Sequence, residues 1–250
     1  MATIEQTLQT TLFVGVVAWR TDPAQLSLCA RSIDVASAAP GAPQLHAAFL
    51  DNSPDEALRA ALPGRDYRFS GANLGFGAAH NKLLAEAFSL PSVRAYLCLN
   101  PDAVLHPHCL SALWTEAAAN PGFGLIEARQ FPDEHAKTYD PVTHKAPWCS
   151  GCCLLISRAA HEQTGGFDER FFLYGEDVDL SWRVRAAGLH VGVAPRAMVH
   201  HYVNDRAETH ASRALIEKGN ALLREKVRAS PALKAVADLT HGPAFAVERW

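Results

Sequence analysis

Apolar and polar residues alternate in blocks along the first half of the chain, and the blocks predict strands and helices in turn. A continuous apolar run rich in β-branched residues, 12–19, is typical of a strand buried on both faces. Asp22 and Pro23 follow. Because Asp is a good N-cap and Pro suits the first helical position, a helix is expected to begin there. The next expected elements are a strand at about 44–50, a helix through about residue 88, a strand at 95–99 and a helix at about 107–119. This order predicts an α/β fold with a parallel, doubly wound sheet.

The second half of the chain has a less regular pattern. Residues 130–147 are polar and contain proline, which indicates a loop. Shorter elements are expected on either side: strands at about 123–128, 152–156, 190–193 and 198–201, and helices at about 157–164, 177–187 and 211–227. We find no internal repeat in the sequence and expect a single domain.

The composition is that of an ordinary globular protein. The chain has 250 residues, of which 48% are hydrophobic and 20% charged, and its formal net charge of −3 does not indicate a general nucleic-acid binder. We see no basic and apolar leader and no apolar run long enough to span a bilayer, so a cytoplasmic protein is expected. Six cysteines are scattered along the chain. Because the one CxxC has no matching second pair, reduced thiols are expected rather than a zinc site.

Three polar clusters directly follow predicted strands: Trp19-Arg20-Thr21, Asp51-Asn52-Ser53 and Asn100-Pro101-Asp102. In an open parallel sheet the carboxyl ends of the strands meet at one edge, and ligands bind beyond that edge. One such cluster is usually a turn or a helix cap. Three in succession favour a binding site.

A glycine-rich segment, residues 71–81 (GANLGFGAAHN), leads into the second predicted helix. It contains Gly75 and Gly77 but no GxGxxG, because His80 occupies the sixth position, and no strong apolar strand directly precedes it. A dinucleotide-binding fingerprint needs both features, so a nicotinamide-dependent oxidoreductase is disfavoured. A tight turn into a helix is the alternative interpretation.

Residues 165–183 hold five carboxylates among aromatic side chains: Asp168, Glu169, Glu176, Asp177 and Asp179. Helix capping and the helix dipole explain one or two acids near the start of the expected helix. They do not explain all five. Crowded carboxylates near apolar rings tend to have raised pKa values, which suits a general base.

Together these segments resemble the GT-A-fold glycosyltransferases of family 2, most of all the rhamnosyltransferase-type branch. The matching blocks run from about residue 13 to residue 201, and their order and spacing carry the resemblance: VAWRTD, DNS, NLGFGAAHN, LNPDA, WCSGCCLLI, GGFDERFFLYGEDVDLSWR and VHH. The resemblance implies one GT-A domain on a mixed, mainly parallel sheet flanked by helices. A nucleotide-binding half (about 11–120) would precede an acceptor and catalytic half (about 121–210) and a C-terminal amphipathic helix (about 211–229).

The resemblance implies an inverting, metal-dependent transfer of a sugar, rhamnose in the nearest branch, from a dTDP- or UDP-sugar to a glycan or lipid-linked saccharide. Asp51 resembles the residue that hydrogen-bonds a pyrimidine base. The other nucleotide-binding residues that it implies are Ala18, Arg20, Asn52, Asn73, Gly75, Asn81, Asn100 and Asp102. Arg20 departs from the family pattern; it would either reach the base or a phosphate, or lie on the surface.

Asn100-Pro101-Asp102 occupies the place of the family's DxD metal motif. Asp102 would bind Mg²⁺ or Mn²⁺, and such hard cations often take only one or two protein carboxylates. Asn100 stands where the family has its first Asp, which removes one charge. His200 resembles the late histidine that completes the metal shell, and His201 is the alternative.

Asp177, beside Glu176, resembles the catalytic base that deprotonates the acceptor hydroxyl. The segment from Trp148 to Cys152, with Gly151, resembles the acceptor side of the site. Trp148 would either stack on a sugar ring or fill the core as a half-buried aromatic.

Asn100 and the altered first strand also fit a non-catalytic module that binds a nucleotide sugar or a partner. The retention of Asp102, Asp177 and His200 argues against it, because a binding module has no use for a base. Five basic residues lie on the last predicted helix: Arg213, Lys218, Arg224, Lys226 and Arg228. This helix would either touch an anionic membrane at its inner face, or a partner, or pack on the domain with a solvated outer face.

Overall fold

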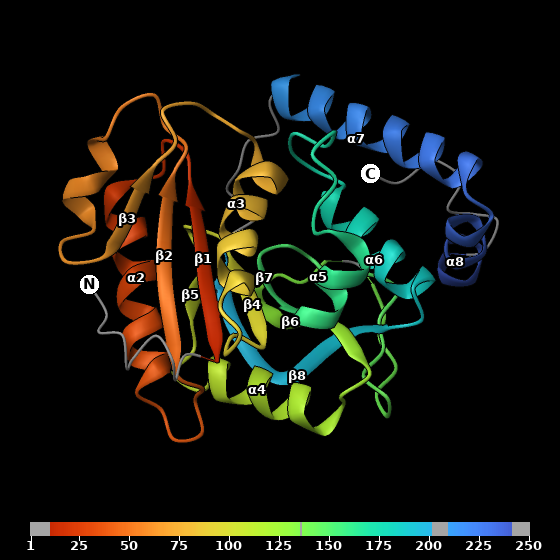
Figure 1. Cartoon of the computed structure of the whole chain (residues 1–250), viewed down its shortest axis with the longest axis horizontal. Helices are drawn as coiled ribbons and strands as arrows, with labels where there is room; N and C mark the ends of the chain where they lie inside the picture. The colour runs from red at the N-terminus through yellow and green to blue at the C-terminus, as the bar shows by residue number, and fades with distance from the viewer. Residues whose placement is uncertain (1–10, 136, 202–209, 242–250) are drawn as a thin grey trace.

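The computed structural model describes residues 11–135, 137–201 and 210–241. Within them, one eight-stranded mixed sheet runs through the molecule (Figure 1). Its spatial order is β3 (Asp66–Phe69), β2 (Leu45–Asp51), β1 (Leu12–Ala18), β4 (Ala95–Leu99), β7 (Cys153–Ser157), β6 (Phe123–Pro132), β8 (His190–His201) and β5 (Val104–Leu105). The pairs among β1 to β4 and the pair β6–β8 are parallel, and the other pairs are antiparallel. The expected mixed, mainly parallel sheet is therefore confirmed.

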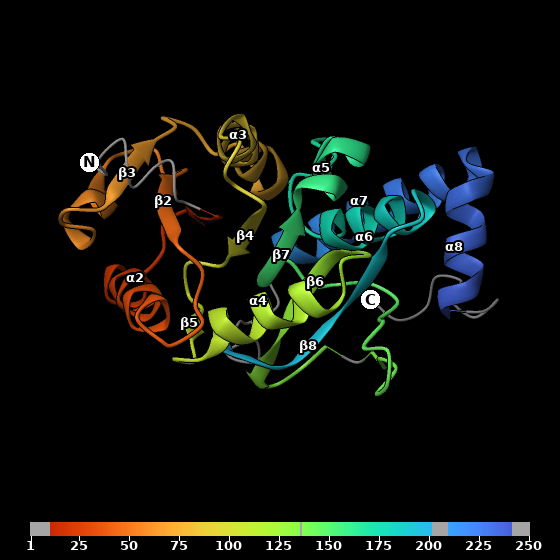
Figure 2. The same cartoon turned by 60° about the horizontal axis from the view of Figure 1, so that its bottom comes forward.

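Helices cover both faces of this sheet (Figure 2). One face carries α2 (Pro23–Ser37) and α4 (Cys109–Ala119). The other carries α3 (Phe76–Ser89), α5 (Arg158–Thr164) and α6 (Glu176–Ala186). Two further helices, α7 (His210–Ala229) and α8 (Pro231–His241), pack beside α6, and a short 3₁₀ helix, η1 (Ala57–Ala61), precedes β3.

Strand β4 shows how the sheet divides the core. Leu97 and Leu99 point into the apolar layer under α2 and α4. Tyr96 and Cys98 point into the layer under α3, α5 and α6. All four side chains are fully buried, as expected for a central strand whose alternate residues face two helical layers.

The helix predicted from Asp22 and Pro23 is confirmed by its cap. Asp22 Oδ1 accepts hydrogen bonds from the backbone N–H groups of Ala24 (2.8 Å) and Gln25 (3.1 Å), which are otherwise unpaired at a helix start. All six cysteines are free and buried, which confirms the expectation of unpaired thiols.

The structure differs from the expected elements in two respects. The two strands expected at 190–193 and 198–201 form one strand, β8, which pairs with β6 through a register shift at Ala128/Arg129. Strands β3 and β5 and helix α8 were not predicted. Strand β3 is short and partly polar, and β5 has only two residues. Helix α8 lies beyond the last motif that was used in the sequence analysis.

Candidate functional site

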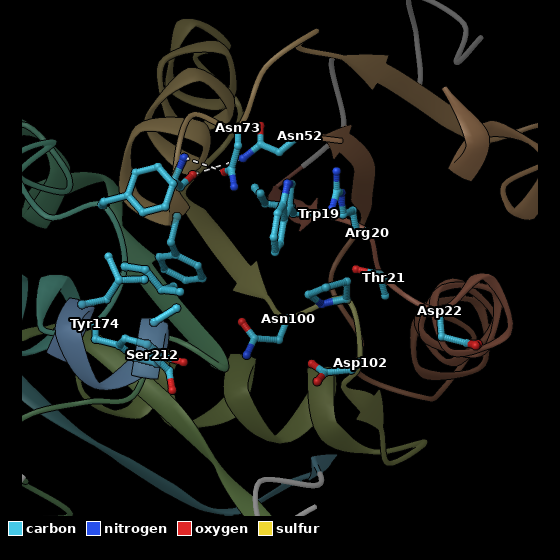
Figure 3. A pocket seen from close by; sticks show the side chains of 18 of the residues that line it. Trp19, Arg20, Thr21, Asp22, Asn52, Asn73, Asn100, Asp102, Tyr174 and Ser212 are labelled. Carbon is cyan, nitrogen blue, oxygen red and sulfur yellow. Dashed lines mark hydrogen bonds between the residues drawn. The ribbon is translucent and has the colours of Figure 1, made fainter. Parts of the chain in front are cut away.

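A pocket of about 550 Å³ opens where β1, β2 and β4 end. Its strand-end residues are Trp19, Arg20, Thr21, Asn52, Asn100, Pro101 and Asp102. The opposite wall is formed by Asn73, Gly75, Phe76, Phe172, Leu173, Tyr174, Ala211, Ser212 and Leu215. In Figure 3, Asn52 and Asn73 lie at one end of the pocket, and Asn100 and Asp102 lie at the other. The structure thus gathers the three strand-end clusters into one pocket.

The residues after β1 form an exposed wall of this pocket. Trp19 is 50% exposed, and the Arg20 guanidinium lies 5.4 Å from the centroid of its indole ring. Arg20 has a φ of +49° and its N–H donates to Ser53 Oγ (2.8 Å), which joins this turn to the one after β2. Ala18 is buried below and contributes only backbone: its carbonyl accepts from Asn52 N (2.7 Å). Trp19 was placed in the first strand-end cluster, but no binding role was predicted for its side chain.

Asp51 and Asn52 were both expected to bind the nucleotide, but their side chains face different surroundings. Both oxygens of the buried Asp51 are occupied, by Ser53 N–H (2.8 Å) and the Tyr67 hydroxyl (2.7 Å), and Asp51 does not line the pocket. Burial, followed by the hydrogen bond to Asp51, raises the pKa of Tyr67, so the phenol keeps the proton that it donates. Asn52 lines the pocket; its Nδ2 donates to Gly75 O (3.1 Å), and its buried Oδ1 has no partner among the described residues. Of these two residues, Asn52 and not Asp51 therefore faces the pocket.

The glycine-rich segment closes the pocket by lying against the loop before α6. Asn73 Oδ1 accepts from Gly75 N (3.1 Å), and Phe76 N donates to Phe172 O (2.9 Å). Gly75 has a φ of +81°, and a Cβ there would lie 2.4 Å from Phe172 O. A glycine is required at this close approach of two backbones.

Asn81 lies outside the pocket, which corrects its expected place beside the nucleoside. Its amide spans both backbone groups of Phe167: Nδ2 donates to the carbonyl (2.9 Å) and Oδ1 accepts from the N–H (2.9 Å). Nδ2 also lies 3.0 Å from Glu169 Oε1. Asn81 therefore anchors to α3 the loop before α6, which carries Asp168 and Glu169.

At the end of β4, Asn100 and Asp102 meet the end of β8. His201 Nε2 lies 3.5 Å from Asp102 Oδ1 and 3.3 Å from Asn100 Nδ2. His200 is exposed, on the opposite face of β8, with its ring 6.1 Å from that of Phe131. His201, the alternative, therefore lies at Asp102, and His200, which was first expected there, does not.

The Asp102–His201 pair fits a divalent cation by its chemistry. His201 Nδ1 lies 2.9 Å from Gln130 Oε1, an acceptor, so Nδ1 carries the proton and the lone pair of Nε2 faces Asp102. Burial lowers the pKa of His201, which keeps the ring neutral as a metal ligand must be. The described residues contain no cluster of three or more His, Cys, Asp or Glu side chains that would hold a metal alone. A cation here would need additional oxygen ligands from a substrate or water.

The Glu176-Asp177 pair opens α6 directly after Tyr174 and Gly175, next to the pocket wall, and neither carboxylate is among the residues that line the pocket. Asp177 is half-buried, and its carboxylate accepts from Gly151 N–H (3.0 Å) and from Val178 N–H (2.8 Å). Glu176 is buried, and its Oε2 has no hydrogen-bond partner among the described residues. Burial, and then the charge of Asp177, raise the pKa of Glu176 to about 8. Near neutral pH the buried Glu176 carboxyl group therefore tends to keep its proton.

The segment before β7 positions Asp177 rather than presenting an aromatic ring. Three successive N–H groups donate to buried side chains: Cys149 to Ser181 Oγ (3.0 Å), Ser150 to Glu127 Oε2 and Gly151 to Asp177 Oδ2 (3.0 Å). Trp148 is 3% exposed, packs in the core with Trp182 and has the Lys137 ammonium 3.8 Å from its ring centroid. The core interpretation of Trp148 therefore holds, and stacking on a sugar is corrected.

Two of the five acids hold α7 against α6. Lys226 of α7 forms ion pairs with Asp168 and Asp179, and Asp179 also pairs with Arg183 (2.7 Å). A Cβ on Gly219 would lie 2.3 Å from Tyr174 O, so α7 rests directly on the backbone before α6. Helix α7 thus packs on the domain, which is one of the alternatives that the sequence left open, and it also forms part of the pocket wall. Sequence gave no signal for this role, because each contact joins residues far apart in the chain.

Part of the chain matches a known protein family. Residues 137–206 match the family described as the N-terminal domain of galactosyltransferase. The chain is 32% identical to the N-acetylglucosaminyl-diphospho-decaprenol L-rhamnosyltransferase of Mycobacterium tuberculosis, over 57% of this chain and 61% of that protein. It is 26% identical to the rhamnosyltransferase WbbL of Escherichia coli, over 60% of this chain and 69% of that protein. The chain therefore spans less than two thirds of the length of the Mycobacterium relative.

Solved structures share the fold at low sequence identity. GalNAc-T7, crystallised with UDP, GalNAc and Mn²⁺, matches with a TM-score of 0.64 at 12% identity, over 87% of this chain and 48% of that one. The mannosyltransferase PcManGT from Pyrobaculum calidifontis, in complex with GDP-Man and Mn²⁺, matches with a TM-score of 0.59 at 14% identity, over 98% and 82%. At such identities the similarity shows the GT-A fold alone.

Proposed function

We propose that the chain is a rhamnosyltransferase-like glycosyltransferase of family 2 and that it transfers a sugar from a nucleoside diphosphate to a saccharide hydroxyl with inversion. The observation that carries the proposal is Asp177. Its carboxylate is held by two backbone N–H groups beside a pocket that gathers Asn52, Asn100, Asp102 and, next to them, His201.

The donor would lie along the pocket with its base at Asn52 and its diphosphate at Asp102. Asn52 Oδ1, buried and without a partner among the described residues, would accept the N–H of an imide such as uracil or thymine. Adenine and cytosine offer no such group at the equivalent ring nitrogen; guanine does at N1, so the choice of a pyrimidine over guanine rests on the family resemblance. Trp19 and Arg20 form the wall beside the base. A dTDP- or UDP-sugar is therefore the proposed donor, with rhamnose favoured by the two rhamnosyltransferases among the relatives.

Asp102 and His201 would hold Mg²⁺ or Mn²⁺. Two glycosyltransferases of this fold contain Mn²⁺ in their crystals, which supports a divalent cation here. Bound there with the diphosphate, such a cation would neutralise the charge of the departing nucleoside diphosphate. Asn100 lacks the negative charge of a second acid, and its Nδ2, which lies 3.3 Å from His201 Nε2, would have to move away for that nitrogen to bind the cation.

The chemistry of the protein's own residues centres on Asp177. Its carboxylate would take the proton of the acceptor hydroxyl as that oxygen forms a bond to the anomeric carbon, and the bond from this carbon to the diphosphate oxygen would break. One displacement inverts the anomeric configuration. Glu176, whose pKa is raised to about 8 by burial and by the charge of Asp177, would keep its proton and would not compete for that of the acceptor.

The proposed acceptor is a glycan or lipid-linked saccharide. The Mycobacterium relative is named for a decaprenol-linked N-acetylglucosaminyl diphosphate, which supports an acceptor on a lipid carrier and a peripheral place at the inner, cytoplasmic face of a membrane. In the part of the chain that the structure describes, no helix combines the length and apolar character needed to cross a bilayer.

The first test is nucleotide binding followed by sugar transfer. We expect dTDP or UDP with Mn²⁺ to raise the thermal unfolding temperature, by mass action on the folded state, more than GDP or ADP does. The nucleotide that stabilises the protein then defines the sugar donors to assay against lipid-linked and soluble saccharides. Binding with neither transfer nor donor hydrolysis would favour the non-catalytic module. No response of the folded protein to any nucleotide would refute the donor pocket.

A further inference from the structure

A chain of polar side chains crosses the apolar layer directly behind the proposed base. The Tyr96 hydroxyl lies 2.6 Å from His80 Nδ1, His80 Nε2 lies 3.2 Å from Cys98 Sγ, and Cys98 Sγ lies 3.2 Å from Gly151 O. The side chains of Tyr96, His80 and Cys98 are all fully buried. Gly151 is the residue whose N–H donates to Asp177 Oδ2. The chain therefore ends on the residue that holds the base.

The chemistry of these groups gives the chain a single direction. Gly151 O only accepts, so the Cys98 thiol donates to it and can only accept from His80. His80 Nε2 therefore carries the ring proton, and Nδ1 accepts from the Tyr96 hydroxyl. Burial lowers the pKa of His80 to about 3 and raises the pKa values of Cys98 and Tyr96, so every member stays neutral. Each donor points along the chain toward Gly151.

The neighbouring strand β1 leaves room for these side chains. A Cβ on Gly15 of β1 would lie 1.9 Å from the Tyr96 hydroxyl oxygen, so a glycine is needed where the phenol ends. Buried polar groups lose their hydration and destabilise a core unless they are paired. A purely apolar layer would fill this space without that cost. The polar chain is therefore best explained by the group at its end.

The group at its end is a glycine, which is the residue with the greatest backbone freedom. The N–H and the carbonyl of Gly151 belong to the two peptide planes on either side of its Cα. The Cys98 thiol fixes the carbonyl plane, and Asp177 accepts from the N–H plane. A Cβ at Gly151 would lie 3.0 Å from Phe76 Cζ, in the wall of the donor pocket, so a stiffer residue does not fit easily.

We propose that His80 and Cys98 are positioning residues that fix the Gly151 backbone and thereby hold the carboxylate of Asp177 in line for the acceptor hydroxyl. The inference rests on the proposed role of Asp177 as the base. It assigns a task to the histidine of the glycine-rich segment, whose ring also packs 4.6 Å from that of Phe76.

Weakening these hydrogen bonds between Tyr96, His80, Cys98 and Gly151 would affect Asp177 in a specific way. A mobile Gly151 N–H would hydrogen-bond Asp177 less, and hydrogen bonds to a carboxylate favour its charged form. Alignment with the acceptor would also suffer, whereas the donor would still find Asn52 and Asp102. We therefore expect a lower kcat, an unchanged KM for the donor and an acid limb of the pH–rate profile that moves to higher pH.

The test compares Cys98→Ala with Cys98→Ser and with Cys109→Ala. Cys109 is an equally buried thiol on α4, under the other face of the sheet, so it reports the effect of losing a core sulfur alone. Cys98→Ala should lower kcat by about tenfold, the scale expected for a slightly misplaced catalytic group, and shift the acid limb upward. Cys98→Ser, which keeps a hydroxyl donor, should restore most of both. Equal losses in Cys98→Ala and Cys109→Ala, with no shift of the acid limb, would overturn the proposal.

Hydrogen exchange of the Gly151 amide separates this inference from the proposed function. In protein labelled with ¹⁵N-glycine, Cys98→Ala should accelerate exchange at Gly151, and Cys109→Ala should leave it unchanged. Tyr96→Phe, at the far end of the chain, provides a milder variant should Cys98→Ala fold poorly, and it should accelerate the same amide less. Unchanged exchange in both Cys98→Ala and Tyr96→Phe would refute the positioning chain whatever the activity. Accelerated exchange in a protein whose wild type transfers no sugar would refute the proposed function and leave the chain in place.

Discussion

The turn after β2 and the first turn of α6 each place two polar residues side by side in the sequence, one buried and one at the site. After β2, both oxygens of buried Asp51 are hydrogen-bonded, and the residue facing the pocket is the neutral amide of Asn52. In α6, buried Glu176 leaves one oxygen without a partner among the described residues, and its neighbour is the carboxylate of Asp177. In each region one buried oxygen, Asn52 Oδ1 or Glu176 Oε2, has no partner among the described residues, but only Glu176 Oε2 belongs to a carboxyl group crowded by a second one.

This difference matches what each region is proposed to do. A pocket for a base needs fixed hydrogen-bonding groups in a stable frame, which Tyr67 and Ser53 provide by holding Asp51. A general base needs a carboxylate that stays charged and reaches a substrate. Crowding a second, buried carboxyl group beside it costs stability, which is tolerated mainly at functional sites. The predictions below test this contrast.

The largest effect is expected at Asp177. Asp177→Asn should lower kcat by about a thousandfold, within the range found for removal of a general base. The amide keeps the shape of the side chain, so nucleotide affinity measured by calorimetry should not change. Asp168→Asn is the matched control, because Asp168 pairs with Arg170 and Lys226 and should affect stability rather than the chemical step. Wild-type transfer rates in Asp177→Asn would rule out the assignment.

The next effect is expected at the end of β8, where two adjacent histidines face opposite sides. His201→Gln should weaken Mn²⁺-dependent nucleotide binding by about tenfold to a hundredfold. His200→Gln should leave it unchanged, because His200 lies on the exposed face. Titration of Mn²⁺ at a fixed dTDP or UDP concentration measures both. The reverse result would return the ligand role to His200.

A smaller effect is expected at the donor end. Asn52→Ala should weaken the binding of dTDP or UDP by about tenfold, the value of roughly one hydrogen bond. Asp51→Asn should instead lower the free energy of unfolding by about 1–3 kcal/mol, because Tyr67 or Ser53 loses its acceptor. Calorimetry and chemical denaturation distinguish the two. A selective loss of nucleotide affinity in Asp51→Asn would restore the base contact to that residue.

The smallest effect is expected from Glu176 and concerns pH. Its folded-state pKa, about 8, lies above the ordinary value of 4.5, so between these values the folded protein binds more protons than the unfolded chain. Stability contributed by this group must therefore fall as pH rises through that window, by at most about 1.4 kcal/mol per pH unit. Glu176→Gln should flatten the decline between pH 6 and pH 8, measured by denaturation. An equally steep decline in that variant would refute the buried, protonated carboxyl group.

The sequence predicted the sheet well where residues in one short run decide the structure. The apolar runs of β1 and β4 leave no alternative to buried strands, and the Asp22-Pro23 cap defines where α2 begins. It missed β3 because residues 66–69 have neither an apolar run nor full burial and pair only along one edge. Local sequence did not reveal that a single β8 continues past a register shift.

The site was predicted to the level of the segment but not always of the residue. Whether Asp51 or Asn52 faces the pocket depends on Tyr67, and whether His200 or His201 meets Asp102 depends on the face that β8 presents. Lys226 was assigned to a solvated or membrane-facing surface, because its partner acids lie more than forty residues earlier in the chain. Side-chain direction and long-range pairing decide these details, and one sequence does not contain them in readable form.

The stereochemistry of the product tests the central claim most directly. The claim is a single displacement in which Asp177 deprotonates the acceptor hydroxyl and the anomeric carbon is attacked once. The glycoside formed from whichever donor the protein accepts would be examined by ¹H NMR at early times. The coupling constant of its anomeric proton reports the configuration. For a manno-configured sugar such as rhamnose, the one-bond carbon–proton coupling at the anomeric centre reports it instead. We predict a configuration opposite to that of the donor. A product with the donor's configuration would contradict the account, because one attack cannot retain it.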